Sequence, residues 1–194
     1  MNIFYIHSDP VTCAQQHVDK HVVKMILEYA QLLSTAHRVL DGKESTRLSK
    51  SGRRQKAWAL DDERDDVLYS ATHINHPSAK WARHSLANYN FLFRLWIELM
   101  REYHYRYGKI HSSMRLAKHL QKPPTNIPVG EFSAPWRAMP DEYKEDKSVP
   151  DYTMKSYRNY YNGAKRDIFK WKRREQPDWL HNAADGFALL GLLH

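Results

Sequence analysis

The spacing of apolar residues predicts a chain built mainly of helices. Residues 3–6 form a short apolar run that predicts a buried strand, and Asp9 with Pro10 is a pair typical of the start of a helix. Neither glycine nor proline follows until Gly42, so we expect one long helix over about residues 11–40. Its apolar side chains cover most of the helix circumference, which indicates that this helix is largely buried.

A second long helix is predicted between Pro77 and Gly108. Apolar and small side chains recur there at steps of three and four residues, from Trp81 to Tyr103. Shorter helices are expected in three further places: just before residue 72, over about residues 112–121 and over residues 152–174.

Two stretches interrupt the predicted helices. Residues 42–57 hold six lysines and arginines with three serines, and predict a mobile, positively charged loop. Residues 122–150 hold six of the nine prolines and predict a long irregular loop. We therefore expect a mainly α fold, with a single compact helical domain over residues 1–180 and an apolar C-terminal tail over residues 181–194.

Composition narrows the possible functions. The 194 residues include 30 Lys and Arg against 22 Asp and Glu, a formal charge of +8, together with 12 His and 12% aromatic residues. Such a chain favours an anionic partner, most simply double-stranded DNA. The single cysteine, Cys13, excludes an internal disulfide framework and fits the reducing cytoplasm. No apolar stretch is long enough for a membrane span, and no glycine-rich nucleotide motif occurs, so we expect neither membrane association nor a cofactor.

A narrow polar stripe on the first predicted helix carries the candidate chemistry. His17, His21, Lys24 and Glu28 follow one another at steps of three and four residues, between apolar neighbours. Imidazole titrates near neutral pH, and a lysine one turn from a carboxylate on a partly buried face is suited to acid–base work. The alternative interpretation is an ordinary surface ion pair between Lys24 and Glu28 beside structural histidines.

Two of these histidines also have the spacing of zinc ligands on a helix. His17 and His21 lie four residues apart, but the glutamate of a His-Glu-x-x-His motif is missing. We predict no metal site and keep a metal-dependent nuclease or phosphoesterase as an alternative. Its remaining ligands would come from His73, His76, His84 or His111.

Other residues are candidates for holding DNA. Asn75 and His76 precede Pro77 at a predicted helix N-terminus, where backbone N–H groups favour phosphate. Trp81 is expected to pack in the core, with base stacking as a second possible role. Basic side chains near residues 165–174 either contact phosphates or complement the helix dipole. The predicted DNA-binding residues are Lys20, Arg53, Arg54, Asn75, His76, Trp81, Lys170, Lys172, Arg173 and Arg174.

The order of these elements resembles a known family, the pyrimidine-dimer DNA glycosylases typified by phage endonuclease V, and uncharacterised phage proteins given that label. The resemblance extends loosely over residues 1–180. It implies a small helical enzyme of DNA repair, in a bacterial or phage-infected cell, that flips out a nucleotide of duplex DNA and cleaves its glycosidic bond. It is carried by Ala14, Gln16 and His17, by Asn75-His76-Pro77 ahead of the long central helix, and by the pairs Tyr160-Tyr161 and Trp171-Lys172.

The chain departs from that family at both catalytic positions. The family's nucleophile is the α-amine of an N-terminal threonine, assisted by a helix glutamate, whereas residue 2 here is Asn, before which the initiator Met is normally retained. Alignment on His17 places Lys24 at the glutamate position and Glu28 one turn later. We therefore expect either an imine formed by Lys24 or a water activated by Glu28, with a protonated histidine of the stripe neutralising the departing base.

The sequence thus predicts a DNA glycosylase, with or without lyase activity, that removes a damaged or modified pyrimidine. Its predicted catalytic residues are Glu28, Lys24, His17 and His21. A base-modifying transferase with the same flipped-base pocket and a non-enzymatic nucleic-acid-binding module remain open.

Overall fold

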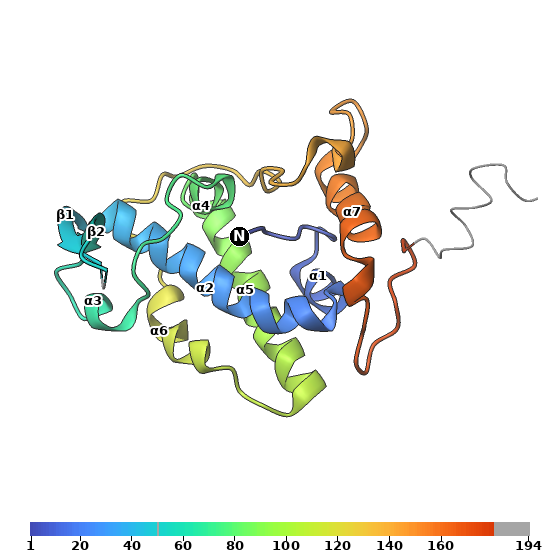
Figure 1. Ribbon diagram of the computed structural model, residues 1–194, viewed down its shortest axis with the longest axis horizontal. Helices are drawn as coiled ribbons and strands as arrows, with labels where there is room; N and C mark the ends of the chain where they lie inside the picture. The colour runs from blue at the N-terminus through green and yellow to red at the C-terminus, as the bar shows by residue number, and fades with distance from the viewer. Residues whose placement is uncertain (50, 181–194) are drawn as a thin grey trace, which may run out of the picture.

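Two long helices, α2 (Asp19–Asp41) and α5 (Leu86–Tyr107), cross at the centre of the fold (Figure 1). The computed structural model describes residues 1–49 and 51–180, so the predicted tail lies outside the described residues. Apolar side chains of both helices form the core, and the indole N–H of Trp96 donates to the carbonyl of Ile26 at 2.9 Å. The prediction of a mainly α fold is confirmed. None of the described helices is long and apolar enough to cross a membrane.

The first predicted helix is broken in two. Helix α1 (Pro10–Gln16) begins after Asp9, as predicted, but His17 and Val18 are extended before α2 starts. The break leaves carbonyl groups without helical partners, and Arg106 of α5 donates to two of them, Gln15 and His17, at 2.8 and 2.9 Å. Because Arg106 is distant in the sequence, the local pattern of residues 11–40 could not reveal the break.

The second predicted helix is broken in the same way. Helix α4 (Pro77–Ala82) ends before Ser85, and the Ser85 hydroxyl caps α5 by accepting from the N–H of Asn88 at 3.2 Å. Gly108 ends α5 in the left-handed region, with φ of 65°, at the predicted position.

The shorter elements follow the prediction in part. Helix α3 (Arg64–Val67) lies just before residue 72, and residues 112–121 contain a 3-10 turn, η1 (Ser112–Leu116), followed by α6 (Ala117–Leu120). Helix α7 (Tyr152–Ala164) stops well short of residue 174, and only the 3-10 turn η3 (Arg166–Ile168) follows it. Residues 122–150 are irregular, as predicted, apart from η2 (Asp141–Tyr143), and connect α6 to α7 across the molecule (Figure 1).

Residues 3–6 are buried, but the prediction of a strand there is wrong. The segment pairs with no other strand in the described part of the chain. Side chains satisfy its backbone instead: the N–H of Phe4 donates to the hydroxyl of Tyr29 at 3.0 Å, and Arg158 donates to the carbonyl of Ile6 at 2.9 Å. The apolar run therefore reflects burial of an extended segment between helices.

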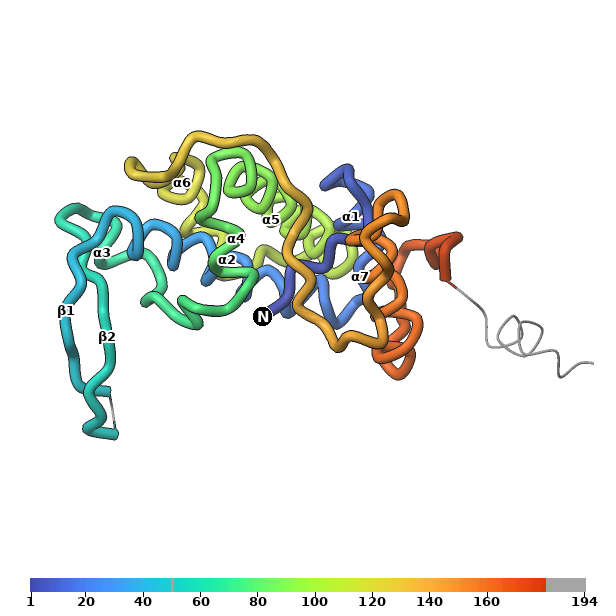
Figure 2. The backbone as a smooth tube through the Cα atoms, turned by 90° about the horizontal axis from the view of Figure 1, so that it is seen from above, coloured from blue at the N-terminus to red at the C-terminus, as the bar shows by residue number. Residues whose placement is uncertain are grey.

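The prediction of a mobile loop over residues 42–57 is also wrong. Strands β1 (Lys43–Leu48) and β2 (Arg54–Ala59) form an antiparallel hairpin, here called the β-ribbon, which projects from the helical body (Figure 2). Gly42 joins it to α2, where a Cβ atom would lie 2.5 Å from the carbonyl oxygen of Arg38. The Arg38 guanidinium donates to the carbonyl of Trp58 at 2.8 Å and so anchors the base of the ribbon.

Candidate functional site

Glu28 of α2 lies between two amines. Its Oε1 is 3.2 Å from Nζ of Lys24, and its Oε2 is 3.9 Å from the α-amino nitrogen of Met1. The Glu28 side chain is 14% exposed, that of Lys24 is 64% exposed and that of Met1 is 5% exposed. Lys24 is therefore exposed, although the sequence placed it on a partly buried face. The second amine beside Glu28 is the α-amine of Met1, a partly buried residue whose side chain packs against the core.

Burial of the N-terminal segment positions this α-amine. Ile3 and Ile6 are fully buried, and the Phe4 N–H is bonded to Tyr29, which lies one residue beyond Glu28 on α2. The hydroxyl of Ser78, in the first turn of α4, donates to the carbonyl of Met1 at 3.3 Å. Met1 is thus held between α2 and α4, near the centre of the view in Figure 1.

The loop that precedes α4 is bound to the same helix. Thr35, which continues the polar stripe of α2, accepts from the N–H of Thr72 at 3.1 Å and donates to its carbonyl at 3.4 Å. His73 adopts a left-handed backbone with φ of 48°, which is strained for a residue with a side chain. His73 and Asn75 are exposed, so this loop presents an imidazole and an amide to solvent beside the site.

Arg83 holds the same loop. Its Nη2 donates to the carbonyl of Ile74 at 2.8 Å, whereas its Nη1 is buried and has no hydrogen-bond partner among the described residues. Burial lowers the pKa of Arg83. The N–H groups on Nη1 of Arg83, beside residues 73–76, are therefore donors without an acceptor among the described residues.

His76 completes the group around Glu28. Its Nδ1 accepts from the N–H of Ser78 at 3.1 Å and caps α4, so the neutral ring carries its proton on Nε2. Burial, the Met1 α-amine and His73 lower the pKa of His76, while Glu28 opposes them. Ser78 connects His76 to Met1, because its N–H donates to the His76 ring and its hydroxyl donates to the Met1 carbonyl.

His17 lies in the core, away from the predicted stripe. Its fully buried ring donates from Nδ1 to the carbonyl of Cys13 at 2.6 Å, and its Nε2 has no partner in the described part of the chain. Burial lowers the pKa of His17 to about 4. The structure therefore contradicts the predicted role of His17 as a protonated acid.

His21 is also a neutral, buried side chain. Its ring stacks on Phe4 with centroids 4.2 Å apart, and its Nδ1 shares a hydrogen bond of 2.7 Å with the hydroxyl of Tyr161. Burial, followed by neighbouring cations, lowers the pKa of His21 to about 3. The predicted role of a protonated acid is contradicted for His21 as well.

A pocket of about 260 Å³ lies beside His21. Lys20 and Lys24 of α2 and Lys165, just after α7, line it, and we call it the lysine pocket. Asp167 and Ile168 also contribute to its wall. Lys24 is paired with Glu28, and the Lys165 ammonium lies over the ring of Tyr160. The predicted phosphate contact of Lys20 therefore stays a prediction.

Other predicted DNA-binding residues are engaged inside the protein. Trp81 is fully buried and donates from its indole N–H to the carbonyl of Ser133 at 2.9 Å, so the prediction of base stacking is wrong. Arg174 pairs with the buried Glu102 at 2.9 Å, and its guanidinium covers the ring of Tyr105. The Arg174 guanidinium is therefore paired with residues of α5 and is not free to bind a phosphate.

The residues before Arg174 remain at the surface but are fastened to α5. Lys172 lies over the ring of Tyr107, and Arg173 donates to the carbonyl of Tyr105 at 2.8 Å. The side chain of Lys170 is exposed. Because α7 ends at Ala164, this basic segment does not form the helix end that the sequence predicted.

Arg53 and Arg54 belong to the β-ribbon. Both are exposed, and neither forms an ion pair with a carboxylate among the described residues. Elsewhere in the described ranges, no group of three or more His, Cys, Asp or Glu side chains is placed to hold a metal ion. The metal-dependent alternative therefore has no ligand set in this part of the chain.

Comparisons with protein-family models, curated proteins and solved structures gave no match for this chain. The functional argument consequently depends on the residues around Glu28. Of the residues grouped here, sequence reasoning singled out Glu28, Lys24 and His76 and missed Met1, because only the folded chain brings residue 1 to the middle of α2. The buried run at residues 3–6 was the signal that could have indicated a fixed N-terminal segment.

Proposed function

We propose that this protein is a DNA glycosylase that removes a damaged or modified pyrimidine from duplex DNA. The observation that carries the proposal is the position of Glu28 between the Met1 α-amine and the Lys24 ammonium, next to His76. A carboxylate stabilises the positive charge that develops at C1′ when a glycosidic bond breaks. An amine beside it supplies the nucleophile, and a neutral imidazole N–H supplies a hydrogen bond to the departing base.

The Met1 α-amine is the better nucleophile of the two. The Met1 carbonyl accepts from Ser78, so this α-amine is held beside Glu28. Its residue is also much less exposed than Lys24. Lys24 then serves to orient the Glu28 carboxylate, with which it forms the shorter ion pair.

The reaction can be written with its protons balanced. The neutral amine nitrogen forms a bond to C1′ while the bond from C1′ to the base nitrogen breaks, and the base leaves as an anion that takes a proton from water. Glu28 accepts the proton that the amine loses. Opening of the bond between C1′ and the ring oxygen then gives an imine between the protein and the sugar, which water hydrolyses.

Trapping of that imine tests the proposal directly. The protein is incubated with duplexes that each carry one candidate lesion, such as a pyrimidine dimer, uracil or 5-hydroxymethyluracil, in the presence of borohydride. We expect a covalent adduct on one of them, and peptide mapping then distinguishes the α-amine from Lys24. N-terminal sequencing of the same sample identifies the residue that bears the free α-amine.

Substitution of Glu28 has a matched control. Glu28→Gln is expected to lower turnover at least about 100-fold while DNA affinity is retained. Glu98→Gln removes a carboxylate of similar exposure, 12%, that pairs with Arg101 on the surface of α5, and should leave turnover unchanged. Equal turnover of Glu28→Gln and the parent protein would exclude the proposed site. Full binding with no excision of any lesion would favour the non-enzymatic module.

A further inference from the structure

The β-ribbon presents positive charge that the fold does not use. All six residues of β1 are exposed, and Arg54, Gln55 and Lys56 of β2 are exposed as well. Lys56 pairs with Glu44 at 2.6 Å, whereas Lys43, Arg47, Arg53 and Arg54 form no ion pair with a carboxylate of the described chain. The base of the ribbon is anchored by Arg38 and the buried Trp58, so its exposed arginines are held in place on a fixed hairpin.

The strand register places distinct residues on the two faces of the ribbon. Directly opposed pairs share a face, so Ser45 with Ala57 and Arg47 with Gln55 lie together. This face has small side chains near the body and long hydrogen-bonding side chains toward the turn. An arginine and a glutamine are the side chains that most often contact guanine and adenine edges in the major groove.

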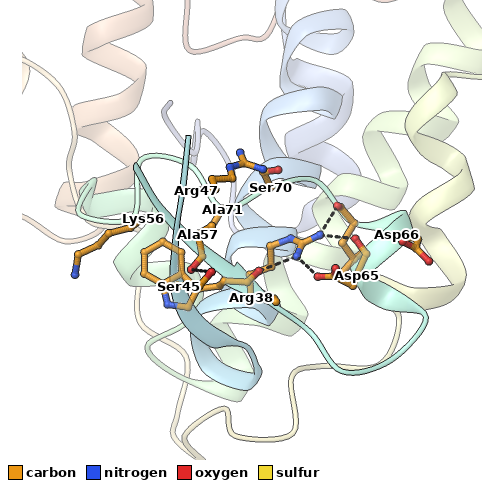
Figure 3. Close-up of a pocket in the computed structure, with 12 residues that line it drawn as sticks. Arg38, Ser45, Arg47, Lys56, Ala57, Asp65, Asp66, Ser70 and Ala71 are labelled. Atoms are coloured by element: carbon orange, nitrogen blue, oxygen red, sulfur yellow. Dashed lines mark hydrogen bonds and ion pairs between the residues drawn. The ribbon is translucent and has the colours of Figure 1, made fainter. Parts of the chain in front are cut away.

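The same face of the β-ribbon borders a pocket at the surface of the helical body. A pocket of about 420 Å³ lies between the β-ribbon and the segment after α3 (Figure 3). Ser45, Arg47 and Ala57 line it from the ribbon, and Ser70 and Ala71 line it from the segment. Residue 72 follows at once and begins the loop that is bound to α2 beside the candidate site.

The β-ribbon and the chain start also lie on one side of the molecule. In Figure 2 the ribbon projects past the helical body on the side where Met1 lies. Asp41, at the base of the ribbon, is about 13 residues beyond Glu28 on α2, which corresponds to roughly 20 Å of helix. At 3.4 Å per base pair, that distance corresponds to about six base pairs of DNA.

We propose that the β-ribbon enters the major groove of duplex DNA, about six base pairs from the nucleotide held at Glu28. The inference rests on the proposed function for the position of that nucleotide. Strands of six residues are about 20 Å long, and a two-stranded ribbon fits a major groove about 12 Å wide. Arg53 in the turn and Arg54 at the start of β2 contact phosphates at the groove edge, while Arg47 and Gln55 face the base edges.

The test compares two triple variants with equal loss of charge. Arg47, Arg53 and Arg54 are replaced by Gln in the ribbon variant, and Arg94, Lys109 and Lys147 are replaced by Gln in the control, all of them exposed residues. Affinity for a short mixed-sequence duplex with one tetrahydrofuran abasic-site analogue is measured against salt. We expect the ribbon variant to lose at least about tenfold in affinity and about three from the slope of log K against log salt. The control should change little.

Chemical footprinting fixes the groove and the distance. The parent protein should protect guanine N7, a major-groove atom, about six base pairs to one side of the abasic analogue, and the ribbon variant should lose that protection. Unchanged affinity and protection in the ribbon variant would overturn the inference, as would protection confined to the minor groove. Neither result affects imine trapping at Glu28, so the two proposals fail separately. Thermal melting of both variants verifies that they are folded.

Discussion

Two sets of arginines in this molecule use the same side chain in opposite ways. Arg38 and Arg106 are buried, and their N–H groups donate hydrogen bonds within the protein, in each case to backbone carbonyls and to a carboxylate. Arg53 and Arg54, on the β-ribbon, are exposed and form no ion pair with a carboxylate of the described residues. The positive side chains behind the formal charge of +8 therefore fall into two groups with different roles. One group maintains helix junctions, and the other is available to an anion.

The buried set is formed around breaks in helices. Arg106 donates to the carbonyls of Gln15 and His17 at the junction of α1 and α2, and pairs with Asp19 at 2.8 Å and Glu102 at 2.6 Å. An arginine has five donors in a planar arrangement and can satisfy such a set at once. On the β-ribbon, Arg47 donates to the side-chain oxygen of Gln55 at 2.9 Å, but Arg53 and Arg54 form no ion pair with a carboxylate of the described residues.

The largest expected effect is that of Arg106→Met on stability. Breaking a buried ion pair by removing one partner costs about 3–5 kcal/mol, because Glu102 keeps its buried charge and carbonyl groups lose their donors. Urea unfolding followed by circular dichroism measures the change. Arg106→Lys keeps the charge but not the planar donors, and should be intermediate. A loss below about 1 kcal/mol for Arg106→Met would show that this network is dispensable.

The next effect concerns pH and the neutral interior. Burial lowers the pKa of His37 to about 4, and its ring accepts from Arg64 at 3.0 Å and donates to Tyr89 at 2.8 Å. The unfolded state binds a proton near pH 6.5, so the stabilisation is present above that pH and is lost as pH falls toward about 4. Between about pH 7 and pH 5 this one histidine should cost about 2 kcal/mol.

His37→Gln isolates that contribution, since glutamine can both accept from Arg64 and donate to Tyr89. The variant should lose about 2 kcal/mol less than the parent protein between about pH 7 and pH 5, measured by urea unfolding at each pH. Parallel curves for the two proteins would show that His37 is not kept neutral by the fold. Exposed His73, outside the core, provides the matched substitution of a histidine by glutamine.

The sequence predicted those features that depend on neighbours along the chain. The buried face of α2, the cap at Asp9, the stop at Gly108 and the pairing of Lys24 with Glu28 all follow from local spacing. The break at His17 could not be predicted in this way, because its acceptors are satisfied by Arg106 from another helix. The β-ribbon was missed for a related reason. Its strands carry polar side chains on both faces and lack the apolar alternation that identifies a strand.

Predictions for the candidate site also succeeded where they depended on local sequence patterns and failed where they depended on packing. Glu28 and His76 were found because each lies in a recognisable local pattern, a helical stripe and a helix start. His17 and His21 were assigned charged roles that burial against Phe4 and Tyr161 excludes. Burial is a property of the packed chain, so the stripe indicated which residues are polar but not which of them meet solvent.

A smaller effect is expected at the turn of the β-ribbon. Gly52 has φ of 76°, in the left-handed region, and a Cβ atom there would meet nothing within 4 Å. Gly52→Ala should therefore cost only the backbone strain, about 1 kcal/mol, and weaken the ribbon locally. Hydrogen exchange of ribbon amides should increase while that of α2 stays unchanged. Slower exchange in the ribbon after this substitution would contradict the turn geometry.

The smallest expected effect is that of Arg53→Gln on stability, and it sharpens the contrast with Arg106. An exposed arginine without a carboxylate partner contributes almost nothing to the fold, so the free energy of unfolding should change by less than about 0.5 kcal/mol. Removal of one repelling charge from a chain of net charge +8 acts in the stabilising direction, and salt should reduce even this difference. Urea unfolding at low and high salt measures both. A loss above about 1 kcal/mol would mean that Arg53 has an internal partner, and the β-ribbon would then owe its charge to folding and not to DNA.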